Sequence, residues 1–591
     1  MGNNEDSGNG VAETRSYWRW SKEDFIPEES FQSWSSYGLA ISQTGHRFKD
    51  RLLARSDELA EVSEVRMRSE NDMKKCLNWW DLTWFGFGSV IGAGIFVLTG
   101  QEARDHAGPA IVLSYVVSGL AAMLAVFCYT EFAIEIPVAG GSFAYLRVEL
   151  GDFVAFIAAA NLLLESVIGG AAVARAWTSY FATLLNHQPN SFRLHVKSLA
   201  KDFNYLDPVA IAVLWIAATI AMSSTRKASL INWFLTLINT LGLILVIVMS
   251  FWHGSTSNLH PFFPFGPSGV FRAAAIVFFA YSGFDRIATM AEETKNPSRD
   301  IPMGLLGSMS LIIVIYCLLA LSLVMMQSYT MIDPNAAYSL AFEKAGLHWV
   351  KILVALGALK GMSTVLLLGS LGHARYVTHI ARAHMLPPLF ALVHPKTQTP
   401  IYATLLVTIL KSVFAFFSSL HVLANLLSVS TLFIFVLMSI ALLVRRYYLR
   451  GSTPRANLAK LACFLLVIIG SSIGTAAYWA LGTKRWVGYT ITIPFWFMGT
   501  LGLSISLPQQ RLPKVWGVPL VPWLPSLSIA VNVFLMGSLD YLTFVRFGVC
   551  TLVMIVYYVL FGLHATYDTA HQKGKLVTEN CRNGSVELPL A

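Results

Sequence analysis

Charged residues are scarce in this sequence. Of its 591 residues 13% are charged and 55% are hydrophobic, whereas soluble domains carry about 25% charged residues. A chain with so few charges has too little polar surface to fold as a water-soluble globule. The composition therefore excludes the soluble classes and predicts a polytopic membrane protein.

Cysteines, basic runs and targeting signals are also scarce. The six cysteines lack metal-ligand spacing and four of them lie in apolar stretches, so we expect neither a disulfide framework nor a metal site. No basic run suggests a nucleic-acid partner, and residues 1–77 lack the apolar core of a signal peptide. No nucleophile and base form a recognisable pair, so we expect neither an enzyme nor a cofactor.

Long apolar stretches are what the sequence has in abundance. A membrane span needs about 20 mainly apolar residues, and this rule predicts about 14 helices. Basic residues are more numerous in the loops that face the cytosol when the N-terminus is inside, and cytosolic loops commonly carry such an excess. We therefore expect both termini in the cytosol.

Two of the predicted helices, the first and the sixth, are interrupted in the same way. Gly92 and Gly94 lie in the middle of the first, and Gly283 is followed by Asp285 and Arg286 in the sixth. Unpaired backbone groups at membrane depth are tolerated where they line a cavity or bind a ligand. Glycines also serve close helix packing, but two breaks in corresponding helices favour the binding site of a secondary transporter.

The positions of the breaks predict the organisation of the chain. Each set of five helices opens with a broken one, which is the pattern of an inverted repeat. We therefore expect an all-α fold with a 5+5 inverted repeat and four accessory helices. The expected parts are a cytosolic N-terminal segment, the first repeat, the second repeat, accessory helices 11–14 and a cytosolic tail, at residues 1–79, 80–252, 253–444, 445–567 and 568–591.

The first break offers two complementary poles to a ligand. The half-helix that follows Gly92, Ala93 and Gly94 has free N–H groups and the positive end of its dipole, which attract a carboxylate. The preceding half-helix ends near Val90 and Ile91 with free carbonyl groups, which attract an ammonium group.

The sixth helix offers the same groups at Phe279 and Ser282. A site with a carboxylate pole and an ammonium pole fits the zwitterionic backbone of an amino acid. Glycine is suited to such a site because a Cβ atom would hold the ligand away from the backbone.

Three acidic residues lie within or beside the predicted helices. Glu165 is inside the third helix, where an ionisable residue indicates a functional site. Its carboxylate suits a cationic substrate side chain or a proton, and a structural pair with Arg175 is the alternative. We expect Glu131 to form a cap or gate contact at the cytosolic end of the second helix, and Asp285 to pair with Arg286 or cap its half-helix.

Lys360 and Lys411 also fall within predicted spans. We expect the ammonium group of Lys360 to reach the outer surface, and we count neither lysine as a site residue. The charged stretch 292–302 predicts an inner loop in which two prolines end and restart helices. Its charges are either solvated or part of an inner-gate network.

Five motifs occur in order between residues 77 and 568. They are Val90-Ile91-Gly92-Ala93-Gly94-Ile95-Phe96, Tyr129-Thr130-Glu131-Phe132, Val173-Ala174-Arg175-Ala176-Trp177, Ala291-Glu292-Glu293-Thr294-Lys295-Asn296-Pro297 and Ala381-Arg382-Ala383-His384-Met385-Leu386-Pro387. In this combination the chain resembles the amino acid–polyamine–organocation superfamily, and within it the plant-type cationic amino acid transporters.

The resemblance implies transport of lysine, arginine, ornithine or histidine by alternating access. It implies that the amides of Ala93 and Gly94 bind the substrate carboxylate, and it assigns the acidic position of the third helix to Glu165. In relatives, the glutamate that matches Glu131 is needed for transport. The carbonyl groups implied to bind the substrate amine belong to Val90, Ile91, Phe279 and Ser282.

The chain departs from the family pattern at two positions. Arg286 replaces a small or apolar residue, which weakens the expectation of cationic substrates. Asn239 stands where proton-coupled relatives carry a lysine whose ammonium group mimics a sodium ion, which leaves the coupling mechanism open.

We predict a secondary transporter of cationic amino acids that is driven by membrane potential, with proton coupling left open. We expect it in the plasma membrane, with the vacuolar membrane as the alternative. Membrane lipids and an amino-acid substrate are the expected partners. The other hypotheses are a carrier for neutral amino acids and a nutrient receptor of the same fold, with an ion channel less well supported because no filter-like sequence occurs.

Overall fold

The structure is a computed structural model whose described residues are predominantly helical. They are residues 18, 20–52, 77–136, 141–200, 203–223, 240–288, 294–395, 397, 399–482 and 486–582. Their single sheet pairs two short antiparallel strands, β1 (Leu194–His195) and β2 (Tyr205–Leu206). The prediction of an all-α fold is confirmed.

The described helices include long spans and several short connecting pieces. The first half contains α1 (Trp34–Ser42), α2 (Thr44–Leu52), α4 (Trp79–Val90), α5 (Ala93–Glu102), α6 (Ile111–Glu135), α7 (Gly141–Glu149), α8 (Asp152–Leu184), α9 (Pro208–Ser223), the helix Thr240–His253, α11 (Gly266–Val277) and α12 (Asp285–Ala288). The second half contains α13 (Pro297–Met326), α14 (Ala337–Lys344), α15 (His348–Arg382), α16 (Ile401–Phe417), α17 (Leu420–Tyr447), α18 (Arg455–Ala480), α19 (Val487–Ser506), α20 (Trp523–Gly537), α21 (Tyr541–Tyr557) and α22 (Leu563–Arg582).

The described helices confirm a polytopic membrane protein. Seven are long and apolar enough to cross a bilayer, and five shorter apolar helices accompany them. Each of the predicted spans overlaps an observed helix, although the boundaries differ. α15, for example, runs to Arg382, and its last turn carries His379 and Arg382, which a criterion of apolar composition does not count.

One predicted helix boundary is wrong. α13 begins at Pro297 and includes Pro302, so the second proline does not restart a helix. Its missing N–H falls close to the helix start, where it removes one backbone hydrogen bond. The carboxylate of Asp300 accepts from the backbone N–H of Asn296 at 3.2 Å and stabilises this start.

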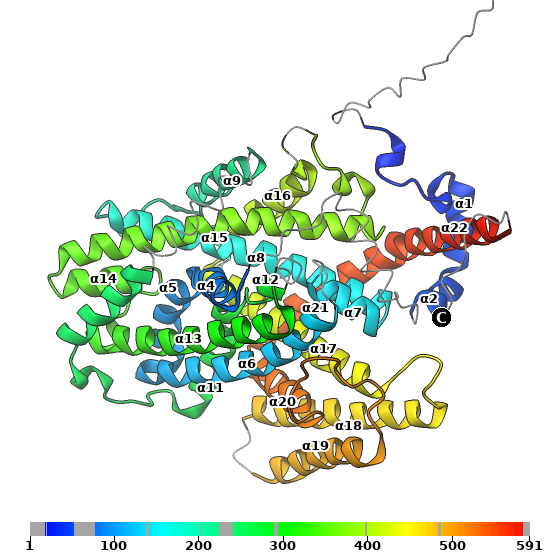
Figure 1. Cartoon of the computed structure of the whole chain (residues 1–591). Helices are drawn as coiled ribbons and strands as arrows, with labels where there is room; N and C mark the ends of the chain where they lie inside the picture. The colour runs from blue at the N-terminus through cyan, green and yellow to red at the C-terminus, as the bar shows by residue number, and fades with distance from the viewer. Residues whose placement is uncertain are drawn as a thin grey trace, which may run out of the picture.

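The helices enclose the two broken ones. In Figure 1, α4, α5 and α12 lie in the middle of the molecule, with α6, α11 and α13 on one side and α8 and α15 on the other. α13 packs against both α4 and α6, and α8 packs against α15, α16 and α17. The accessory helices α18, α19 and α20 pack together, and α20 joins them to the bundle by packing on α17 and also on α6 and α11.

The N-terminal segment packs on the C-terminal helix. The blue helices α1 and α2 lie beside the red helix α22 in Figure 1. Asp568 of α22 accepts from the backbone N–H of Ser30 at 2.8 Å and from the guanidinium of Arg47 at 3.1 Å. The two ends of the described chain are therefore joined by buried polar contacts.

Candidate functional site

The first helix break lies between α4 and α5. α4 ends at Val90, Ile91 is extended with φ −70° and ψ 100°, and α5 begins at Ala93. The first N–H groups of an α-helix have no acceptor within the helix, and Gly92 at the N-cap of α5 supplies no side-chain acceptor for them. The break predicted at Gly92 is confirmed, and it presents the positive end of a helix dipole.

The second break follows the 3₁₀ turn Phe278–Tyr281 that continues α11. Ser282 is extended and Gly283 has φ +108°, which is backbone that glycine adopts without strain. α12 then begins at Asp285. The predicted break in the sixth helix is therefore also confirmed, with Asp285 in the first turn of the half-helix that follows it.

The two breaks are in direct contact. The hydroxyl of Ser89 donates to the carbonyl oxygen of Gly283 at 3.1 Å. A Cβ atom built on Gly94 would lie 2.6 Å from the Cα atom of Ala280. Gly94 therefore lets the first turn of α5 lie against the second break, a packing role additional to the amide role that the resemblance implies.

A tyrosine from a neighbouring helix also joins the breaks. The hydroxyl of Tyr316, on α13, lies 3.0 Å from the carbonyl oxygen of Val90 and 3.1 Å from that of Ala280. The carbonyl oxygen of Phe279 accepts from the N–H of Ser282 at 2.9 Å. Of the carbonyls implied to bind the substrate amine, that of Phe279 thus accepts one hydrogen bond already, and that of Val90 shares the single proton of Tyr316 with Ala280.

Glu165 lies on α8 close to this region. Gly169 is one turn further along the same face, and a Cβ atom on Gly169 would lie 3.7 Å from the ring of Phe279. The carboxylates of Glu165 and Asp285 both act electrostatically on the phenol groups of Tyr129 and Tyr376. The third and sixth helices therefore bring both carboxylates within electrostatic range of the same two buried tyrosines.

The alternative pairing of Glu165 with Arg175 is wrong. The buried guanidinium of Arg175 donates to three backbone carbonyl oxygens, those of Ala415 at 2.8 Å, Phe416 at 3.4 Å and Tyr205 at 3.0 Å. It therefore ties the end of α16 to the strand β2 and serves the architecture.

Lys411 has a place near the site that the sequence did not indicate. It is fully buried on α16, and its ammonium group lies 3.3 Å from Nδ1 of His373. A Cβ atom on Gly170 would lie 2.8 Å from Cε and 3.3 Å from Nζ of Lys411. A cation thus contacts α8 little more than one turn beyond Glu165.

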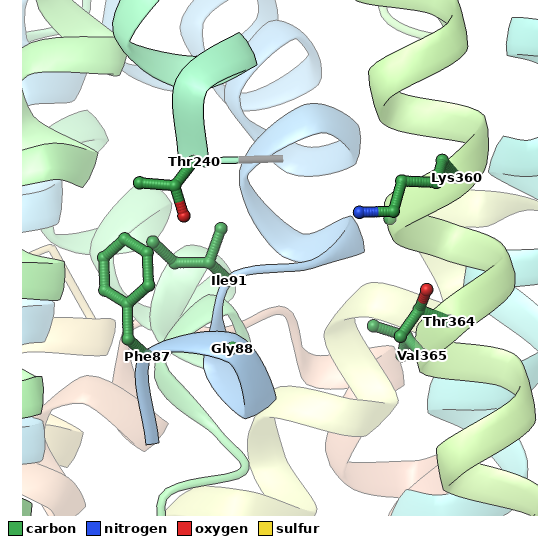
Figure 2. Close-up of a pocket in the computed structure, with 8 residues that line it drawn as sticks. Phe87, Gly88, Ile91, Thr240, Lys360, Thr364 and Val365 are labelled. Atoms are coloured by element: carbon green, nitrogen blue, oxygen red, sulfur yellow. The ribbon is translucent and has the colours of Figure 1, made fainter. Parts of the chain in front are cut away.

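Lys360 lines a pocket beside the first break (Figure 2). The side chain extends from α15 toward the chain that joins α4 and α5, so the expectation that it reaches the outer surface is wrong. Among the described residues its ammonium group has no ion-pair partner. The pocket is lined by Phe87, Gly88, Ile91, Thr240, Lys360, Gly361, Thr364 and Val365.

The remaining predicted residues lie away from the breaks or outside the described chain. Buried Glu131 accepts from the guanidinium of Arg446 and from the backbone N–H of Val518, both at 2.8 Å. This arrangement agrees with a cap or gate contact and links α6, α17 and the segment before α20. Asn239 lies outside the described residues, as do Glu292 and Glu293.

No metal-binding group was expected from the sequence. Within the described ranges no group of three or more His, Cys, Asp and Glu side chains has the geometry to hold a metal ion.

Sequence comparisons identify the family to which this architecture belongs. The sequence model of the amino acid permease family matches residues 77–455, which include both breaks. The chain belongs to the amino acid permease family. A second model, for the C-terminus of these permeases, matches residues 516–566. The recognition of the family from sequence motifs is confirmed.

The permease is similar to transporters with different names. It is 70% identical to cationic amino acid transporter 5 of Arabidopsis thaliana, over 95% of this chain and 99% of that protein. It is 59% identical to the vacuolar cationic amino acid transporter 8 of the same plant, over 95% of each. It is 34% identical to the methylthioribose transporter of Bacillus subtilis, over 73% of this chain and 92% of that protein. The permease is thus a membrane transporter by family.

Proposed function

We propose that this permease carries cationic amino acids across a membrane by alternating access. The observation that carries the proposal is the contact between the two helix breaks, beside the carboxylates of Glu165 and Asp285. The free N–H groups that open α5 suit the substrate carboxylate. Carbonyl groups at both breaks suit its ammonium group.

The charge of the substrate side chain is the next part of the proposal. We assign the substrate side chain to the face of α8 that carries Glu165. Gly169 lies one turn further along this face, and because it has no side chain, the ring of Phe279 at the second break packs close to α8, 3.7 Å from where a Cβ atom of residue 169 would lie. A carboxylate at membrane depth is costly unless it meets a cation or a proton. Two of the relatives are named for cationic amino acids, which favours the same substrate class.

The proposed movement involves the two repeats, residues 80–252 and 253–444. The breaks lie in the first helix of each repeat, so rocking of one repeat against the other opens the site to either side. We place both termini in the cytosol and the protein in the plasma membrane. The vacuolar membrane is the alternative, since one relative carries that location in its name.

The driving force follows from the charge of the substrate. A negative interior supplies ~2.3 kcal/mol per charge per 100 mV, which is sufficient for concentrative entry of a cation. The residue aligned with the coupling lysine of proton-driven relatives is Asn239, which cannot titrate. We therefore expect uptake to follow membrane potential and to depend weakly on an imposed pH gradient.

A carrier for neutral amino acids is the second candidate. The buried ammonium group of Lys411 contacts α8 at Gly170, which opposes a second cation nearby. This observation favours a neutral side chain, whereas Glu165 and Asp285 favour a positive one.

Uptake by reconstituted vesicles distinguishes these proposals. Radiolabelled arginine is offered with membrane potential set by a potassium gradient and valinomycin, and leucine or glutamine is added as competitor. Arginine uptake that follows potential and resists leucine supports the cationic carrier. Leucine uptake that excludes arginine supports the neutral carrier, and no uptake of either contradicts transport of these amino acids.

A further inference from the structure

Tyr316 is a single hydroxyl group placed between the two broken helices. It lies on α13 and is fully buried. Its oxygen is 3.0 Å from the carbonyl oxygen of Val90, the last residue of α4, and 3.1 Å from that of Ala280, just before the second break. One side chain from a third helix thus reaches both breaks at once.

The ring of Tyr316 is held in place by two other buried tyrosines. Its centroid lies 5.7 Å from that of Tyr115 and 5.2 Å from that of Tyr281. Tyr281 donates to the backbone carbonyl of Tyr115 at 2.8 Å, and the hydroxyl of Tyr115 lies 2.7 Å from that of Thr99 on α5. Because each neighbour is itself hydrogen-bonded, the hydroxyl of Tyr316 cannot turn away without disturbing three helices.

The hydroxyl has one proton and faces two acceptors. A tyrosine O–H donates one hydrogen bond, so the carbonyl oxygens of Val90 and Ala280 share a single donor. A buried carbonyl group without a full donor carries a desolvation cost. Among the described residues no other donor reaches either oxygen, so one of these two break carbonyls is under-satisfied in the empty carrier.

We propose that Tyr316 positions the two breaks, and that Tyr316 and the substrate each donate a hydrogen bond to one of the two break carbonyl groups. Its proton serves one carbonyl oxygen, and the substrate ammonium group donates to the other. This inference rests on the proposed function in one respect, namely that the substrate has an ammonium group. Tyr316 acts through the backbone of α4 and of the 3₁₀ turn Phe278–Tyr281, so it is a positioning residue.

The proposal predicts an unusual result for Tyr316→Phe. The substitution keeps the ring and its packing and removes one oxygen, which leaves both break carbonyls without a donor in the empty carrier. A bound ammonium group relieves that cost. The variant should therefore bind arginine about tenfold more tightly, equivalent to ~1.4 kcal/mol, while its maximal transport rate falls because release is slower.

Tyr338→Phe is the matched control. Tyr338 lies on α14, is also buried, and donates to the carbonyl oxygen of Leu319 at 3.1 Å, on the same helix as Tyr316. Leu319 lies inside α13, where its carbonyl also accepts the bond of the helix itself. The control thus removes a buried tyrosine hydrogen bond whose acceptor is not a break carbonyl, although its ring packs on Phe96 of α5, 5.7 Å between the ring centroids.

The experiment combines a ligand-dependent and a ligand-free measurement. Arginine affinity is measured by thermal stabilisation of the purified protein, and uptake kinetics separate KM from maximal rate. Without ligand, hydrogen exchange is followed in peptides that cover residues 90–95 and 280–285. Tighter arginine binding and faster exchange at both breaks in Tyr316→Phe, with neither change in Tyr338→Phe, support the proposal.

The opposite results overturn it. If arginine affinity is unchanged or weaker in Tyr316→Phe, the substrate does not share these carbonyl groups. If exchange at the breaks equals that of Tyr338→Phe, the bridge does not position them. Wild-type protein that binds no arginine contradicts the proposed substrate, and the ligand-free exchange still decides the positioning role.

Discussion

Gly94→Ala tests the contact between the two breaks most directly. A Cβ atom at this position would lie 2.6 Å from Cα and 2.8 Å from Cβ of Ala280, whereas carbon atoms in contact are about 3.5–4.0 Å apart. The nearest atom belongs to the backbone of the second break and cannot rotate away. One methyl group therefore forces the breaks apart by roughly 1 Å.

The expected cost follows from this overlap. Overpacking of a buried contact costs ~1–3 kcal/mol, so the unfolding temperature of Gly94→Ala should fall. The same shift displaces the N–H groups that open α5, and misplacement of a binding group by about 1 Å can cost up to a hundredfold in rate. We expect arginine uptake to fall at least tenfold.

Gly357→Ala is the control for this substitution. Gly357 lies on α15, and a Cβ atom there would meet no atom within 4 Å. Since alanine is favoured over glycine in a helix by ~1 kcal/mol, this variant should be as stable as wild type or more so. Uptake into vesicles and thermal unfolding are measured for both variants.

Two outcomes for Gly94→Ala contradict this reasoning. Wild-type stability with wild-type uptake means that the breaks do not pack as closely as described. Lost uptake with unchanged stability assigns Gly94 to ligand binding alone.

Three further substitutions test the charged groups around the breaks. Glu165→Gln should weaken arginine binding at least tenfold more than glutamine binding, as measured by competition for uptake, and an equal loss for both would indicate a structural role. Lys360→Met should lower the maximal rate of uptake and change the unfolding free energy by less than ~0.5 kcal/mol, because its ammonium group lines the pocket beside the first break and pairs with no carboxylate of the described residues. An equal effect of Lys344→Met would rule out that specific role. Arg446→Met leaves the buried carboxylate of Glu131 without its ion pair and should cost ~3–5 kcal/mol in a denaturation assay, and a smaller loss than 1 kcal/mol would mean that the pair is not buried.

The breaks were predictable because their causes are local in the chain. Gly92 and Gly94 interrupt an apolar stretch, and Asp285 lies two residues after Gly283 within a stretch that is expected to cross the bilayer. Backbone pairing within a helix depends on residues a few positions apart, so both breaks are visible in the order of residues. The roles assigned to Ala93, Ile91 and Ser282 at these breaks stay predictions.

The partners of polar side chains were not predictable in the same way. Arg175 was a plausible partner for Glu165 by its place on the same helix, but its guanidinium is bound by carbonyl groups of α16 and β2. Lys360 was expected at the outer surface, and it lines the pocket beside Ile91. A long side chain reaches several positions, and the neighbouring helix decides which of them is occupied.

The sequence by itself determined the class of protein, the order of its helices and the two points at which helices stop. These properties depend on hydropathy and on backbone hydrogen bonding between near neighbours in the chain. The tertiary structure alone decided that Tyr316 lies between Val90 and Ala280, and that Gly94 meets Ala280. Such contacts join residues far apart in sequence, and they arise only when the packing of whole helix faces brings those residues together.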